Sequence, residues 1–230
     1  MFRISLYVAV VLMFFGLMLF VVGLFYPVLF IEDGLIETAG AALFFAAAIV
    51  SLYCLIAGRN TCSRLETVVT VLLVPASLVL ALSEISFGAR LGLLSPPAMY
   101  GGGEFDGGHD ALILILRLIR DGQLSGWFYL IVAFISVTAG WAAYRWRHLG
   151  LRLWSDIKSN PLLLGVAASA SLVALAVILD LKSQRHLSLV EETLEFLSAA
   201  VLVATVSYRS LVFKREAWQA KLRDVPGRSI

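Results

Sequence analysis

The chain has little charge, little histidine and little cysteine. Charged residues make up 15% of its 230 residues, whereas an average soluble domain carries about 25%. The sequence has three histidines and two cysteines, which are too few for a zinc signature built from such residues at regular spacing. It contains no nucleophile elbow, Walker loop or dinucleotide fingerprint. These shortages exclude a soluble globular domain and the common motif-bearing enzyme classes.

Apolar residues are abundant instead, at 60% of the chain, and the mean hydropathy is +0.90. A helix that crosses a bilayer needs about 20 apolar residues, so six such helices and their connections use nearly the whole chain. We therefore predict an all-α integral membrane protein, a single transmembrane domain over 1–230 that forms a six-helix bundle. The predicted helices are 5–28, 35–57, 67–87, 126–144, 161–181 and 187–213.

The longest connection, 88–125, has an irregular part and an apolar part. Ser95-Pro96-Pro97 and the glycines at 101–103 favour turns. The run 111–120 that follows is too short to span a membrane and too apolar for a free loop, which predicts an interfacial or re-entrant helix. The segments 145–160 and 214–228 are basic, and we expect them to be a loop and a tail.

The six-helix topology separates the charges. It places 13 of the 18 Lys and Arg residues on one side and 12 of the 16 acids on the other. Cytoplasmic segments of membrane proteins collect Lys and Arg, so the basic side is predicted to be cytoplasmic, with both termini there and a location in the cell's cytoplasmic (inner) membrane. The basic excess favours anionic lipid headgroups and needs no nucleic-acid partner.

Many of the outer acids are explained by helix starts, where the macrodipole favours carboxylates. Ser188 and Glu191, for example, have the spacing of a capping box. Glu84 is different, because it is predicted in the last turns of a helix, where the dipole opposes it and the membrane interior penalises it. Glu195 lies too deep to cap, and like charges crowd it from Glu191 and Glu192. These acids need a cation, an arginine or a proton.

His109 lies among Glu104, Asp106 and Asp110 on a glycine-rich segment. Such a group suits a divalent cation or a proton relay, and a solvated loop is the alternative.

Two segments carry a resemblance that covers roughly residues 30–115. Glu32-Asp33-Gly34-Leu35-Ile36-Glu37 resembles the Glu-Asp-Gly-x-x-Glu segment of an uncharacterised family of bacterial multi-pass membrane proteins. The segment from Glu84 to Arg90 is similar to that family's Glu-Glu-Ile-Ser-Trp-Gly-Gln-Arg, although Ser83, Phe87 and Ala89 depart from it. The resemblance supplies no reaction. It implies that five residues belong to one site, namely Glu37, Glu84, Arg90, Glu104 and His109.

The leading hypothesis from these residues is a membrane-embedded enzyme, a metal-assisted hydrolase or transferase that acts on lipid headgroups at the outer interface. Its catalytic residues are Glu84, His109 and Glu195, and its substrate-binding residues are Arg90 and Arg117. Its metal, a divalent cation, is held by some of the following residues: Glu37, Glu84, Glu191 and Glu195.

Two other classes of function remain open. In a proton- or cation-coupled carrier or channel, the same carboxylates titrate during transport. A pathway also needs polar residues in the inner half of the helices, which looks almost purely apolar apart from scattered Ser and Thr. In a non-catalytic scaffold, the acidic face binds other membrane subunits. The expected partners are thus membrane lipids and, for the scaffold, other subunits of a membrane complex.

Overall fold

The computed structural model describes residues 2–26, 29, 34–57, 63–86, 95, 97–102, 110–145, 147–180 and 188–223. Eight α-helices account for nearly all of these residues. They are α1 (Phe2–Phe25), α2 (Leu35–Ala57), α3 (Arg64–Glu84), α4 (Asp110–Arg120), α5 (Gly126–Arg145), α6 (Arg147–Ser159), α7 (Pro161–Asp180) and α8 (Ser188–Arg223).

Within the described residues, four helical segments are long and apolar enough to cross a membrane: Leu35–Ala57, Arg64–Glu84, Pro161–Leu179 and Ser188–Arg215. Large apolar side chains such as Ile56, Leu72 and Leu211 are exposed on the outside of these helices. That surface suits lipid and not water. The described part of the chain is thus helical, as predicted, and its four long apolar helices are those of a membrane protein. The six-span topology stays a prediction.

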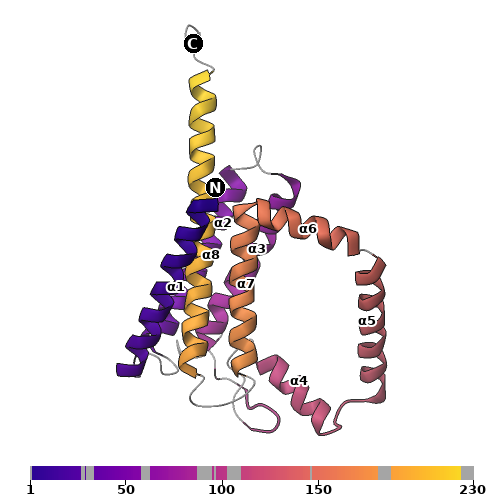
Figure 1. The fold of residues 1–230 in the computed structure, drawn as a ribbon. Helices are drawn as coiled ribbons and strands as arrows, with labels where there is room; N and C mark the ends of the chain where they lie inside the picture. Colours follow the sequence, from indigo (N-terminus) through magenta and orange to yellow (C-terminus); the bar gives the residue numbers. More distant parts are fainter. Residues whose placement is uncertain are drawn as a thin grey trace.

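Helices α1, α2, α3, α7 and α8 form a bundle, and α4, α5 and α6 form an arm on one side of it (Figure 1). Within the arm α5 stands apart from the bundle. It packs against α6, and its Tyr129 hydroxyl donates to the Ile119 carbonyl of α4 at 3.4 Å, while most of its side chains are exposed. Both termini lie at the same end of the molecule (Figure 1). We call this the Glu66 end of the bundle, and the opposite end, where α2 and α8 begin, the Glu84 end.

Several predicted helices agree with the structure to within three residues at each end, and α4 confirms a short helix in the 88–125 connection. Two predictions were wrong. The basic segment expected as a loop after residue 144 forms helix α6. Helix α8 continues to Arg223 instead of ending at 213. At about 1.5 Å per residue, it is about 54 Å long and projects beyond the bundle (Figure 1).

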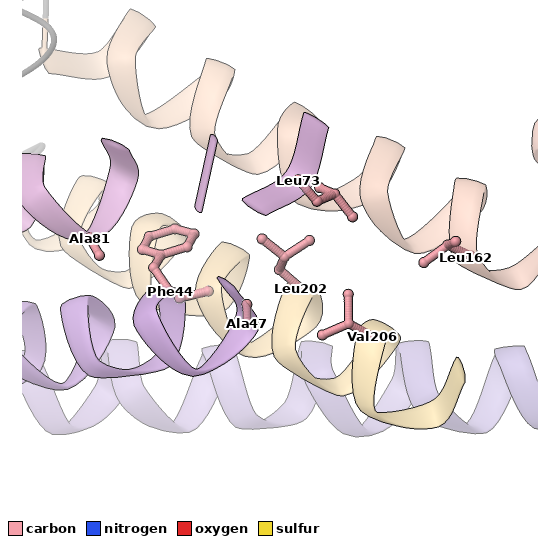
Figure 2. Packing of buried hydrophobic residues seen from close by; sticks show 8 residues of the cluster. Phe44, Ala47, Leu73, Ala81, Leu162, Leu202 and Val206 are labelled. Carbon is pink, nitrogen blue, oxygen red and sulfur yellow. The ribbon is translucent and has the colours of Figure 1, made fainter. Parts of the chain in front are cut away.

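Small side chains in the core let the helices approach one another closely. Phe44 and Ala47 of α2 pack with Leu202 and Val206 of α8 (Figure 2). A Cβ atom at Gly165 of α7 would collide with Thr205 of α8.

A buried serine pair also joins α7 to α8. The Ser169 hydroxyl donates to the Ser198 carbonyl at 3.0 Å, and the Ser198 hydroxyl donates to the Ser169 carbonyl at 3.1 Å. Small residues and interhelical hydroxyl bonds are how membrane helices associate without a hydrophobic driving force.

One carboxylate, Glu66, joins three helices. It closes a capping box at the start of α3, in which Glu66 Oε2 accepts the Ser63 amide at 3.0 Å. Its Oε1 accepts a hydrogen bond from Asn160 Nδ2 at 3.0 Å. The side-chain Oδ1 of Asn160 in turn accepts the Leu162 amide and so caps the start of α7. Arg209 of α8 donates Nη2 to Glu66 Oε2 at 3.0 Å. Both charged side chains are largely buried, so each needs the other.

Replacing Glu66 by Gln should lower the free energy of unfolding by about 2–4 kcal/mol, because Arg209 is then left charged and without its carboxylate. Thermal or denaturant unfolding of the full chain in detergent micelles measures this. The double variant Glu66→Gln/Arg209→Met should lose clearly less than the sum of the two single variants. Additive losses would mean that the ion pair contributes no coupling.

Candidate functional site

The buried face of α3 has a carboxylate at each end. The buried residues of this helix are Glu66, Thr70, Leu73, Ser77, Ala81 and Glu84. Their spacing of three or four residues keeps all of them on one face. Glu66 and Glu84 are 18 residues apart, or about 27 Å along the axis, close to the ~30 Å thickness of a bilayer's hydrocarbon core. This face therefore runs between two buried carboxylates across the width of a membrane.

Glu84 lies in the contact between α3 and α2. Its exposed fraction is 8%, and its Oε2 lies 3.5 Å from where a Cβ atom of Gly40 would stand. Gly40 has no side chain, so the carboxyl group lies directly against the α2 backbone. The sequence predicted Glu84 as the acid that neither a cap nor the dipole explains, and the structure places it inside the bundle.

The other acids of the Glu84 end lie on helix faces that point inward. Glu37 precedes buried Gly40, Ala41 and Phe44 at helical spacing on α2. On α8, Glu191 and Glu195 continue a line that includes buried Ala199, Leu202 and Val206. All three acids are half-buried. Helical periodicity thus directs Glu37, Glu191 and Glu195 toward the bundle interior at the same end as Glu84.

The chain leaves α3 through a strained residue. Ser86 has φ +49°, and it is the one described residue other than glycine with a positive φ. The left-handed region costs an L-residue roughly 1–2 kcal/mol, and such outliers cluster at functional sites. Ser86 lies two residues after Glu84, so the strain occurs where the helix must end immediately beyond the buried carboxyl group.

Arg117 of α4, predicted to hold an anionic headgroup, donates to two backbone carbonyls. Its Nη1 donates to the Tyr100 carbonyl at 3.2 Å and to the Gly102 carbonyl at 2.5 Å. Gly101 and Gly102 have φ of +82° and +99°, and a Cβ atom at Gly101 would come within 3.1 Å of Arg117. In this arrangement Arg117 fixes the turn at 99–102, a structural role that the sequence did not indicate.

Arg120 and Asp121 account for one more of the acids predicted on the outer side. Arg120 Nε donates to Asp121 Oδ1 at 2.8 Å, and this hydrogen bond holds the pKa of Asp121 below its usual value. The pair is at the surface, where ion pairs contribute little. It is a local pair and no part of the buried face.

Several predicted site residues lie outside the described residues, namely Arg90, Glu104 and His109. Among the residues that the structure describes, no three or more His, Cys, Asp or Glu side chains are arranged to hold a metal ion. The proposed metal set of Glu37, Glu84, Glu191 and Glu195 gains no support from this part of the chain. The divalent cation and the catalytic role of His109 stay predictions.

A cavity of about 480 Å³ lies elsewhere, between α1, α7 and α8. Apolar residues such as Phe20, Leu172 and Leu197 form most of its lining. Glu191 and Glu195 lie on another face of α8 from the lining residues Val190, Leu194 and Leu197. The cavity therefore carries no acid and is separate from the candidate site.

The sequence reasoning missed Glu66 and two serines, Ser51 and Ser77. Glu66 was placed in an inner loop, although Ser63-Arg64-Leu65-Glu66 has the Ser-x-x-Glu spacing of a capping box. The serines were regarded as scattered, although Ser77 lies seven residues before Glu84 and Ser51 eleven residues after Gly40. Both spacings return to the same helix face.

Replacing Ser86 by Gly should raise the free energy of unfolding by about 1 kcal/mol, because glycine adopts the left-handed conformation without a Cβ clash. Ser86→Ala is the matched control, since it removes the hydroxyl but keeps the Cβ atom, and it should bring no gain. A Gly variant that is no more stable than the wild type would show that the Ser86 backbone stores no strain.

Comparison of this chain with protein-family models, with curated proteins and with solved structures finds no match. The resemblance to the bacterial multi-pass family therefore stays a prediction. What can be inferred about function comes from the placement of the residues themselves.

Proposed function

We propose that this chain is a proton- or cation-coupled carrier or channel in which the Glu84 carboxylate takes up a proton or a small cation from the outer side of the membrane. The burial of Glu84 between α2 and α3 carries the proposal. A carboxylate inside a membrane protein is costly, and such residues mark ion and proton pathways.

The buried face of α3 supports transport over metal-assisted catalysis. The objection to a carrier was that the inner half of the helices looked apolar. Thr70 and Ser77 of α3 are nevertheless buried on the same face as the two carboxylates, and Ser51 is buried on α2. The hydroxyls that looked scattered along the sequence thus follow one interface between Glu84 and Glu66.

The proposal includes the predicted topology, with six spans and cytoplasmic termini. It adds α1 and α5 to the four long apolar helices. Trp127 and Tyr129 lie at one end of α5, and Trp141 and Tyr144 lie at the other. Aromatic residues gather at both interfaces of a membrane, which supports α5 as a spanning helix surrounded by lipid. An even number of spans also agrees with two termini at one end (Figure 1).

The test is an ion flux measured with the full chain reconstituted in phosphatidylethanolamine and phosphatidylglycerol vesicles. A dye sensitive to pH or to Na⁺ inside the vesicles separates proton from cation transport under a potential set by K⁺ and valinomycin. We expect wild-type vesicles to take up one of the two ions faster than empty vesicles, and Glu84→Gln to reduce that flux at least tenfold. Gln keeps the size of the side chain but has no negative charge to attract a cation and no proton to release.

Asp156→Asn is the matched control, because Asp156 is an exposed acid on α6 at the other end of the bundle. It should leave the flux unchanged. Wild-type vesicles that leak no faster than empty ones would overturn the proposed function. A Glu84→Gln variant with the wild-type flux would show that Glu84 takes no part in the transport.

Gly40 gives a second test of the same site. A Cβ atom there would meet Glu84 Oε2 at 3.5 Å, an ordinary van der Waals distance, so Gly40→Ala should keep most of the flux. Gly40→Val adds two methyl groups to that contact and should displace the carboxyl group, lowering the flux toward that of Glu84→Gln. Equal flux from both variants would show that Glu84 does not act from this position.

A further inference from the structure

Two hydroxyl groups in the middle of the bundle are buried without a protein partner. Ser51 of α2 and Ser77 of α3 each have an exposed fraction of 0%. Among the residues that the structure describes, neither Ser51 Oγ nor Ser77 Oγ has a hydrogen-bond partner. Unsatisfied buried polar atoms are rare in native proteins, and each one calls for an explanation such as a bound water.

Other hydroxyls on these helices behave differently. The Ser171 hydroxyl on α7 donates to the Ala167 carbonyl at 2.8 Å, and that of Thr70 donates to the Glu66 carbonyl at 2.7 Å. Bonding to the carbonyl one turn earlier is the usual way for a helical Ser or Thr to be satisfied within its own helix. Ser51 and Ser77 do not use it, so their hydroxyls are available to another group.

Helical periodicity places Ser51 and Ser77 on the helix faces that meet at the Gly40–Glu84 contact. Gly40 touches Glu84 across α2 and α3, Ser51 lies three turns beyond Gly40, and Ser77 lies two turns before Glu84. Because α2 and α3 run in opposite directions, both serines lie deeper in the bundle than the Gly40–Glu84 contact. At 1.5 Å per residue their depths along the bundle axis differ by about 6 Å, so the two hydroxyls lie at neighbouring levels of the bundle.

We propose that Ser51 and Ser77 bind internal water between α2 and α3, and that this water is the mid-membrane step for the ion that enters at Glu84. Buried water characteristically bonds to polar groups that would otherwise be unsatisfied. The water would continue the polar line from Glu84 toward Thr70 and Glu66. The second half of this proposal rests on the proposed function, whereas the water site itself does not.

The stability of serine-to-alanine variants tests the water site without any transport assay. If the two hydroxyls are dry, Ser51→Ala and Ser77→Ala remove an unsatisfied polar group and should raise the melting temperature of the full chain. If they hold water, the same changes remove the hydrogen bond between each serine and that water, and they should lower the melting temperature. Ser171→Ala is the matched control, because it replaces a lipid-exposed hydroxyl that is satisfied within its own helix, and it reports the helix propensity of alanine alone.

We expect both variants to melt below the Ser171→Ala control, and the double variant to melt lowest. In the flux assay, Ser51→Ala and Ser77→Ala should each slow transport by about tenfold, with the control unchanged. Variants that melt at or above the control would overturn the water site. Variants that melt lower but transport at the wild-type rate would show that the water is bound but is not part of the ion path. The Glu84→Gln variant still tests the proposed function separately.

Discussion

The arrangement of the bundle depends on keeping a charged carboxylate, Glu66, inside it. A buried charge is tolerated only when it is paired and its remaining lone pairs are hydrogen-bonded. Ser63, Asn160 and Arg209 meet that need from the starts of α3 and α7 and from the middle of α8. Apolar packing among small side chains holds helices together but fixes their register only loosely. The directional hydrogen bonds of Glu66 fix how α3, α7 and α8 are placed relative to one another along the bundle axis.

The carboxylates at the two ends of the α3 face have different neighbours. Glu66 has its cation and its hydrogen-bond donors within the described residues, and it serves as an anchor. Glu84 lies against the bare backbone at Gly40, next to a strained Ser86 and on the same end as the inward faces that carry Glu37, Glu191 and Glu195. One helix thus carries a buried carboxylate at each end of the same face.

Much of the fold follows from the sequence, because apolar runs of membrane length are unambiguous. The short apolar run after 110 also gave α4, since it fits neither a span nor a free loop. Helix α6 and the end of α8 were missed because basic residues were read as loops, although Trp154 and Trp218 lie among those charges. The site was predictable only in part. Glu84 follows from the conflict with the helix dipole, but the alignment of Ser51 and Ser77 requires knowing that α2 and α3 pack through these faces.

The link between Glu66 and Arg209 also sets the timing of assembly. Their residues are 143 positions apart, and ribosomes add about 5–20 residues per second. On the order of 10 s thus separates the synthesis of the acid from that of its cation. Asn160 arrives earlier but brings no charge. During that interval the α2–α3 hairpin carries Glu66 without the cation that pairs with it in the finished bundle. Pairing of Glu66 with its cation therefore waits until α8 has been made.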